Sequence, residues 1–193
     1  NEGGKRVVVW DFGVKKSMID KLHTRGVNTV RVPATYSCEQ VLALNPDGVL
    51  LSNGPGDPAD NPDIIAEVGK LFESGVPIMG ICLGHQLLAL SQGAKSTRLL
   101  YGHRGANQPA MDLKTGRAYM TSQNHGYAIV TSTLPRHAKL LFVNLNDDSC
   151  EGVDYPWHNA FSVQFHPEAS SGPLDTGYLF DRFIDMMGGA RNA

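Results

Sequence analysis

The feature that most constrains this chain is a short apolar run that ends on a cysteine between two glycines. The run Val76–Ile81 overlaps the motif Gly-Ile-Cys-Leu-Gly (80–84), and leucines recur after it. This pattern predicts a buried strand, a tight turn and then a helix, with Cys82 at the turn. In such an elbow the glycines let neighbouring backbones pass close, while the side chain between them projects from the carboxyl end of the sheet.

Cys82 is therefore a candidate nucleophile. At the start of a helix, the positive end of the helix dipole favours a thiolate, and the backbone N–H groups from Leu83 onward can stabilise negative charge. The alternative is a structural cysteine buried in a strand-to-helix turn, since free cysteines are commonly buried. The motif alone does not decide between the two, and the rest of the chain must.

Length and composition indicate one globular domain over residues 1–193. The chain is 41% hydrophobic and carries a formal net charge of −2. We find no basic stripe with interleaved aromatics, so nucleic acid is not an expected partner. No apolar run reaches the roughly 18 residues that span a bilayer, and no secretory segment opens the chain, so we expect no membrane association and a cytoplasmic location.

The cysteines and histidines match no disulfide or metal pattern. There are three cysteines without Cys-x-x-Cys spacing, and the seven histidines form no His-Glu-x-x-His motif. We therefore expect neither a disulfide framework nor a metal site.

The order of predicted elements indicates an α/β fold. Apolar runs predict strands at 6–10, 29–32, 48–51 and 76–81, and helical periodicity or capping residues predict helices at 15–25, 39–44 and 62–73 between them. This alternation favours an open, mostly parallel twisted sheet with flanking helices. Beyond the elbow helix, β-rich segments at 107–112, 117–123, 127–130, 140–144 and 160–164 predict a smaller antiparallel region, with a turn at 114–116 and a last helix from about 175.

A Gly-Pro-Gly-Asp loop (54–57) follows the third predicted strand. It would lie at the carboxyl end of the sheet, close to Cys82. Glycine leaves a backbone N–H unshielded, so the N–H groups of Gly54 and Leu83 could form an oxyanion hole. A plain turn explains the loop equally well.

The motif His-Pro-Glu (166–168) supplies a base and a carboxylate just past a predicted strand. His166 could take the proton of the Cys82 thiol, and Glu168 could orient the imidazole. The sequence gives no catalytic role to two further histidines. We interpret His85 as a packing residue. His125 lies either at a strand end that binds substrate or in a hairpin turn.

In this order, the motifs at 54–57, 80–86 and 166–168 resemble those of class I (triad) glutamine amidotransferase domains, whose core is flavodoxin-like, and the resemblance covers nearly the whole chain. Within that class, the segments 10–15, 122–127 and 166–176 are similar to the small subunit of carbamoyl phosphate synthetases.

The resemblance implies that Cys82 attacks L-glutamine, with His166 as acid and base and Glu168 as its orienter. Ammonia would pass to the synthetase large subunit, where ATP and Mg²⁺ are expected; no cofactor is expected in this chain. The family's glutamine-binding positions correspond to Gly54, Gly56, Leu83, Gln86, Asn124, Gly126 and Tyr127. The family often has phenylalanine at the position of Tyr127, which leaves the backbone contact in place but changes the local packing.

Three alternatives remain at this point. The acceptor could be that of a GMP synthase or an anthranilate synthase, the domain could be a non-catalytic regulatory module, or the cysteine could serve a peptidase or esterase. The complete small subunit of the family also has an N-terminal domain. Because the first predicted strand begins within a few residues of the start of the sequence, we expect that domain to belong to a longer protein or to a separate chain.

Overall fold

The computed structural model describes residues 4–169 and 174–188. Positions 170–173, within the segment that carries part of the family resemblance, lie outside the described residues. The first half alternates strands and helices in the order β1 (Arg6–Asp11), α1 (Lys16–His23), β2 (Asn28–Pro33), α2 (Cys38–Leu42), β3 (Gly48–Leu51), a 3-10 turn η1 (Pro58–Asp60), α3 (Pro62–Glu73), β4 (Ile78–Ile81) and α4 (Leu83–Ser91). The second half contains β5 (Ser96–Asp112), β6 (Ala118–Ile129), η2 (Thr131–Thr133), β7 (Lys139–Asn144), β8 (Cys150–Tyr155), β9 (Ala160–Val163), η3 (Leu174–Gly177) and α5 (Tyr178–Met186).

One nine-stranded sheet runs through the molecule in the order β2-β1-β3-β4-β9-β8-β7-β5-β6. The strands from β2 to β9 pair in parallel, and those from β9 to β6 pair antiparallel. The parallel part has the doubly wound order of a flavodoxin-like core, with β9 in the fifth place. The predicted fold class, a mostly parallel α/β sheet with an antiparallel extension, is confirmed.

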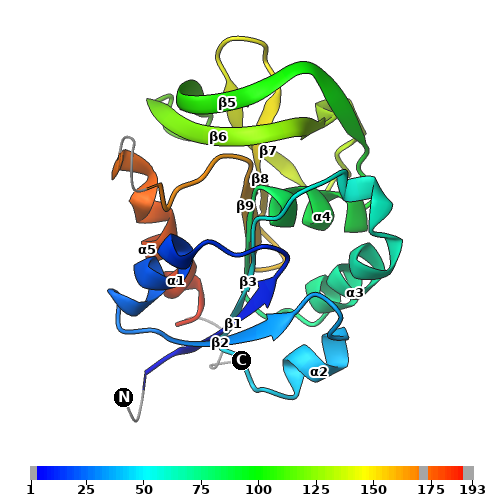
Figure 1. Ribbon diagram of the computed structural model, residues 1–193, viewed down its shortest axis with the longest axis vertical. Helices are drawn as coiled ribbons and strands as arrows, with labels where there is room; N and C mark the ends of the chain where they lie inside the picture. Colours follow the sequence, from blue (N-terminus) through cyan, green and yellow to red (C-terminus); the bar gives the residue numbers. More distant parts are fainter. Residues whose placement is uncertain (1–3, 170–173, 189–193) are drawn as a thin grey trace.

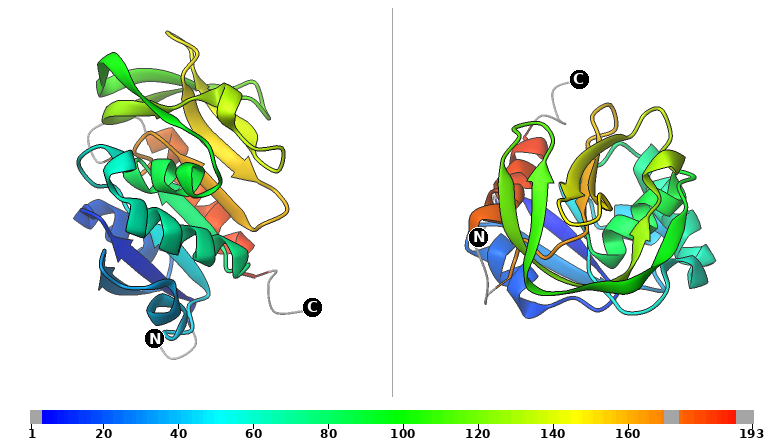
Figure 2. Two further views of the ribbon diagram at one scale, coloured as in Figure 1. Left: turned by 90° about the vertical axis from the view of Figure 1, so that its right-hand side faces the viewer. Right: turned by 90° about the horizontal axis from the view of Figure 1, so that it is seen from above.

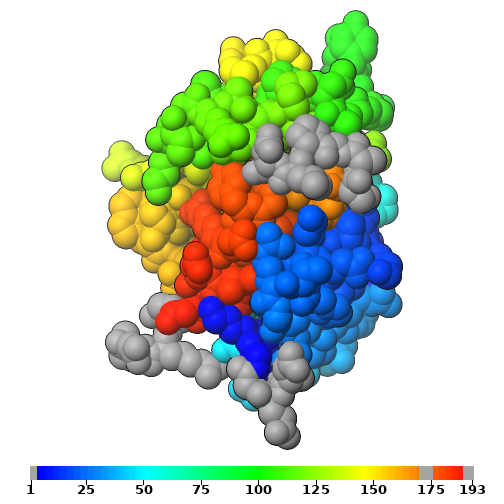
Figure 3. Space-filling view, turned by 90° about the vertical axis from the view of Figure 1, so that its left-hand side faces the viewer, coloured from blue at the N-terminus to red at the C-terminus, as the bar shows by residue number. Residues whose placement is uncertain are grey.

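Helices cover both faces of the parallel part (Figure 1). Successive residues of β1 alternate between the two sides: Val7 and Val9 belong to the core under α1 and α5, whereas Val8 and Trp10 belong to the core under α3 and α4. On the face that Figure 3 presents, α1 lies beside α5, and Arg25 Nε donates to Asp181 Oδ1 at 2.6 Å. Burial on both faces explains why these strands are continuous apolar runs.

The residues from which helix starts were predicted do lie at the starts of helices. Ser37 forms a capping box at the start of α2, because its hydroxyl accepts from Gln40 N while Gln40 Oε1 accepts from Ser37 N. Pro62 opens α3 at its first position. Within the described ranges, no helix combines the length and apolar character needed to cross a bilayer.

The antiparallel part differs from the prediction in its extent. β5 and β6 form a long hairpin that arches over the carboxyl end of the parallel strands (Figure 2). β5 begins at Ser96 rather than near residue 107, and β6 continues through residues 124–126, where a hairpin turn was one of the two open interpretations. That interpretation is wrong. The turn at 114–116 is present, with Gly116 at φ 72°. β8 was not predicted.

Candidate active site

Cys82 lies at the junction of β4 and α4, where an elbow was predicted. Its backbone has φ 55° and ψ −106°, a conformation that residues with a side chain rarely adopt. The Cys82 N–H donates to the carbonyl of Val163 in β9 at 2.9 Å, which ties the turn to the neighbouring strand. Strain of this kind occurs at nucleophile elbows, because it aims the side chain out of the turn.

Two glycines allow the elbow and the Gly-Pro loop to pack together. A Cβ at Gly84 would overlap the carbonyl oxygen of Leu51 at the end of β3, and one at Gly54 would overlap that of Phe12. The Gly84 N–H also donates to Ser52 O at 3.0 Å. The loop after β3 is therefore held directly against the start of α4, as the sequence predicts.

His166 contacts both Glu168 and the Cys82 thiol. His166 Nδ1 lies 2.8 Å from Glu168 Oε1, and both side chains are almost fully buried. Because an ionised carboxylate only accepts, Nδ1 donates, which leaves Nε2 as the nitrogen available to the thiol. Burial lowers the pKa of His166, but hydrogen bonds to Cys82 and Glu168 outweigh it and raise the pKa to about 9. The structure thus brings the three predicted catalytic side chains together.

Gln164 is a further contact of the thiol that the sequence analysis missed. This fully buried side chain directs Nε2 toward Cys82 Sγ at 3.7 Å. An amide N–H facing the sulfur stabilises it when it is negatively charged. Gln164 lies two residues before His166, just past β9, so the end of one strand supplies both contacts of the nucleophile.

A cavity of about 510 Å³ opens beside Cys82, between the carboxyl ends of the parallel strands and the β5–β6 hairpin. Six of the seven residues predicted to bind glutamine line it, and three charged side chains are also part of its wall. The predicted residues in the lining are Gly54, Gly56, Gln86, Asn124, Gly126 and Tyr127, and the charged ones are Asp57, Arg98 and Arg104.

Leu83, the seventh predicted residue, does not line this cavity with its buried side chain. Its backbone N–H and that of Gly54 have no hydrogen-bond partner among the described residues. Both groups therefore remain available as donors, which is the property that an oxyanion hole requires.

Gln86 has a structural task in addition to lining the cavity. Its Nε2 donates to the carbonyl of Tyr127 at 2.8 Å and to Gln164 Oε1 at 2.9 Å. Both amide protons are used, so this side chain ties α4 to β6 and to the residue that contacts the thiol. Its remaining oxygen can only accept.

His166 and Glu168 line a second, smaller cavity of about 260 Å³. Asn124 lines both cavities. The thiol and the acid–base pair thus line different cavities, and Asn124 contributes to both.

The two histidines left open by the sequence differ in their surroundings. His85 is fully buried, with Nδ1 2.8 Å from Ser162 Oγ, and burial lowers its pKa to about 3, in keeping with a packing role. His125 lies within β6 and lines the larger cavity. Burial lowers the pKa of His125 to about 4.

Comparison with known proteins places these features in a family. The model of the class-I glutamine amidotransferase family matches residues 8–186. Carbamoyl phosphate synthase small chains of Lactococcus lactis and Neisseria meningitidis serogroup B are 50% and 51% identical over 95% and 97% of this chain. The chain spans about half the length of these relatives, 51% and 50% respectively.

Solved structures agree on the fold. A Thermoplasma acidophilum protein provisionally assigned as part of a GMP synthase aligns over 99% of this chain and 98% of its own, with a TM-score of 0.85 and 23% identity. A glutamine amidotransferase of Thermotoga maritima aligns over 98% of this chain and 86% of its own, with a TM-score of 0.67 and 19% identity. Because the family model extends over most of its length, the chain belongs to the class-I glutamine amidotransferases.

Proposed function

We propose that this chain is the glutaminase part of a carbamoyl phosphate synthase. The observation that carries the proposal is the contact of Cys82 with the buried His166–Glu168 pair, next to a cavity of about 510 Å³. The relatives that are about 50% identical and are named carbamoyl phosphate synthase small chain support this acceptor over that of a GMP synthase. The likeness to the Thermoplasma protein, at 23% identity, bears on the fold alone.

The side chains suit hydrolysis of the L-glutamine amide through a covalent intermediate. The thiol of Cys82 gives its proton to His166, and the sulfur attacks the amide carbon. The oxygen becomes negatively charged and is stabilised by the N–H groups of Gly54 and Leu83. His166 returns the proton to the leaving nitrogen, the C–N bond breaks, and ammonia leaves a γ-glutamyl thioester on Cys82.

Water completes the cycle. His166 takes a proton from a water molecule, and the resulting hydroxide attacks the thioester carbon. The C–S bond then breaks to release glutamate, and His166 returns the proton to the Cys82 sulfur. Glu168 holds the imidazole in one tautomer throughout and stabilises its charged form.

The walls of the cavity suit a free amino acid. Asp57 offers a carboxylate for an ammonium group, and Arg98 and Arg104 offer guanidinium groups for a carboxylate. Asn124, Gly126 and Tyr127 present one strand along the same wall, so we propose that they bind the glutamine backbone. A zwitterion of glutamine length matches this distribution of charge better than a peptide does.

The partner is part of the proposal. We propose that ammonia passes to a synthetase large subunit that binds ATP and Mg²⁺, with no cofactor in this chain. Leu100 and Tyr101, at the cavity rim, are 86% and 84% exposed. We propose that the N-terminal domain expected for a complete small subunit packs near these two side chains.

The first test is mass spectrometry of the intact chain after exposure to a reactive glutamine analogue, with peptide mapping and excess glutamine as competitor. A single adduct on Cys82 that glutamine suppresses is the expected result. Scattered labelling that includes Cys38 and Cys150 would contradict a glutamine site at Cys82.

The acceptor is tested separately by adding a carbamoyl phosphate synthetase large subunit, bicarbonate and Mg-ATP. Carbamoyl phosphate should then form from glutamine. Adduct formation without any carbamoyl phosphate, but with amination of xanthosine monophosphate in the presence of a GMP synthetase subunit, would favour the alternative acceptor.

A further inference from the structure

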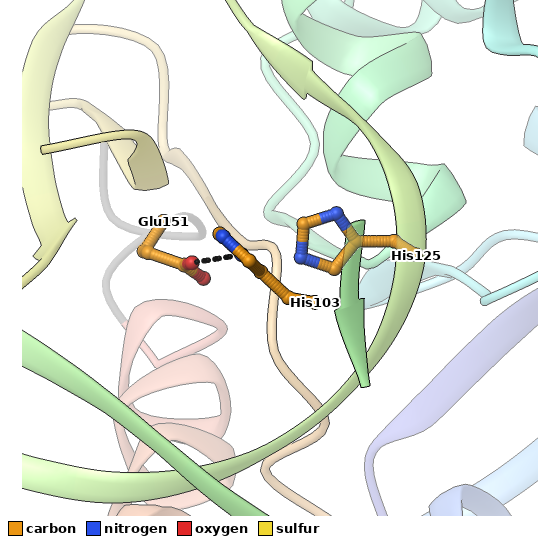
Figure 4. Close-up of side chains that lie close together, drawn as sticks. All are labelled: His103, His125 and Glu151. Carbon is orange, nitrogen blue, oxygen red and sulfur yellow. Dashed lines mark ion pairs between the residues drawn. The ribbon is translucent and has the colours of Figure 1, made fainter. Parts of the chain in front are cut away.

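Three strands of the antiparallel part bring together two histidines and a glutamate that are not members of the triad. His103 comes from β5, His125 from β6 and Glu151 from β8, and the potential ligand atoms of all three lie within 4.8 Å of one another. In Figure 4 the His103 ring lies between the Glu151 carboxylate and the His125 ring, and the dashed line marks the contact of His103 with Glu151. All three side chains are buried.

The spacing of the donor atoms fits a small ion. His103 Nδ1 lies 3.2 Å from Glu151 Oε1 and 3.1 Å from Gln123 Oε1, and His125 Nε2 lies 2.8 Å from the same Gln123 oxygen. Ligands at about 2.0–2.1 Å from a tetrahedral Zn²⁺ are about 3.3 Å apart. The three measured distances are close to this spacing, and the ligand atoms of the two histidines and the glutamate all lie within 4.8 Å of one another.

The outward-facing atoms of the ligands are already fixed. His103 Nε2 lies 2.8 Å from Asp147 Oδ2, and His125 Nδ1 lies 2.7 Å from the carbonyl of Tyr127. Asn144 Nδ2 donates at 3.0 Å to Glu151 Oε1, the oxygen that faces His103, and so holds the carboxylate in place. Histidines that bind metals typically donate their other ring N–H to a carboxylate or a carbonyl in this way.

Without an ion, the hydrogen-bond donors and acceptors of the cluster cannot all be paired. Gln123 Nε2 donates to Thr121 Oγ1, whose hydroxyl donates to the carbonyl of Gln108, so Gln123 must turn its oxygen toward the histidines. His125 then faces an oxygen acceptor at each ring nitrogen, although a neutral imidazole has only one N–H.

Two further observations point the same way. A second proton on His125 would place another positive charge against the His103 ring, whose centroid is 4.9 Å away. Glu151 Oε2 is buried and has no hydrogen-bond partner among the described residues. A cation at the centre would meet the lone pair of His125 and the Gln123 oxygen, and it would balance the charge of the buried Glu151 carboxylate.

We propose that His103, Gln123, His125 and Glu151 bind a divalent transition-metal ion of the zinc type. Two imidazole nitrogens and two oxygens form a borderline donor set that suits Zn²⁺ rather than Ca²⁺ or Mg²⁺. Four protein ligands leave no open position, so the ion is structural. It joins β5, β6 and β8, and it fixes His125 between Asn124 and Gly126 in the wall of the larger cavity.

The test uses the full chain after removal of metals with a chelator. Because the Cys82 thiol and His166 could also bind zinc, titration calorimetry with Zn²⁺ is done on Cys82→Ala. One equivalent should bind, the midpoint of thermal unfolding should rise with zinc concentration, and Co²⁺ should give the visible absorption of a four-coordinate ion. Absence of saturable binding to Cys82→Ala would overturn the proposal.

Matched variants locate the ion. In the Cys82→Ala background, Glu151→Gln keeps the shape but removes the charge, and His103→Gln removes one nitrogen ligand. Each should weaken zinc binding by at least about 100-fold, since even outer contacts of a metal are worth 10–100-fold. His23→Gln, which changes an exposed histidine, should bind as tightly as the background. Unchanged affinity in both cluster variants would overturn the proposal, and circular dichroism checks that they are folded.

Discussion

Two histidines of this chain each contact a buried glutamate, and their surroundings differ in one respect. His166 Nδ1 is 2.8 Å from Glu168, and His103 Nδ1 is 3.2 Å from Glu151. Hydrogen bonding to Glu151, together with that to Asp147, outweighs burial and raises the pKa of His103 to about 9, the same value as for His166. By distance, burial and pKa, the two pairs are nearly alike.

The difference lies at the second ring nitrogen. In His166 it is left for the Cys82 thiol, whereas in His103 it is taken by Asp147. A histidine can move protons only when one nitrogen meets the reacting group, so a buried His–carboxylate pair is by itself no sign of catalysis. The free nitrogen and its nucleophile are what distinguish the active site from the cluster.

The largest effect should come from removing the nucleophile. Cys82→Ala should lower glutamine hydrolysis by at least about 10⁴-fold, because no covalent intermediate can form. Release of glutamate, measured with the partner subunit present, checks this. Cys38→Ala serves as the control, since Cys38 is a buried cysteine of α2 outside the site. Hydrolysis by Cys82→Ala at the normal rate would refute the mechanism.

Equivalent changes in the two histidines test the comparison directly. His166→Asn should lower kcat by about 10³–10⁴-fold, because the proton of the thiol and that of the leaving nitrogen lose their carrier. His103→Asn should change kcat by less than about 10-fold and act mainly on KM, since His103 contacts no reacting atom. Equal losses of kcat in the two variants would contradict the claim that only His166 acts on the reacting groups.

The two glutamates offer a finer test. Glu168→Gln removes the charge that stabilises the imidazolium but keeps a group that can orient the ring, so the loss in kcat should be smaller than for His166→Asn, about 10²-fold. Glu151→Gln should leave kcat within a few fold while lowering the midpoint of thermal unfolding in the presence of zinc. A steady-state kinetic series combined with melting curves separates these outcomes.

The pH dependence of stability should show both pairs in the metal-free protein. A histidine has a pKa of about 6.5 when unfolded, so a folded pKa of about 9 means that the native state holds extra protons between these values. The contribution of each pair is complete below pH 6.5 and is lost as the pH rises through 9. The free energy of unfolding, measured with urea from pH 6.5 to 9.5, should depend less on pH in His166→Asn and in His103→Asn than in the unmodified chain.

The parallel half could be predicted well because its signals are local. Each strand is a continuous apolar run, and capping residues such as Ser37 and Pro62 mark the following helix. The triad could be predicted for the same reason: Cys82 and the pair His166–Glu168 each lie within a short contiguous motif. The parallel topology then brings those motifs to one edge of the sheet.

The antiparallel half was harder to predict because the apolar patterns of its strands are interrupted. The first part of β5 is mostly exposed, and Gly102 and Gly105 have φ of 69° and 109°, close to where the pairing with β6 shifts register. β8 contains two charged residues and a glycine, Glu151, Asp154 and Gly152, although it is almost entirely buried. Its apolar pattern is therefore too weak to indicate a strand.

The side chains that were missed depend on contacts across the sheet. Gln164 meets the thiol through space, and the cluster around His103 draws on three strands with no fixed spacing between them. The expectation of no metal site rested on the lack of a linear motif, and such a motif is not needed when neighbouring strands supply the ligands. That expectation remains a prediction, which the zinc titration tests.

The backbone of Cys82 has a consequence for how such a domain changes over generations. Glycine is the residue best suited to φ 55° with ψ −106°, and a cysteine codon becomes a glycine codon by one base change. That replacement would relieve the strained turn while ending the chemistry. Selection on folding alone therefore favours an inactive domain of the same shape, and only selection for the reaction proposed at this site would keep the sulfur in place.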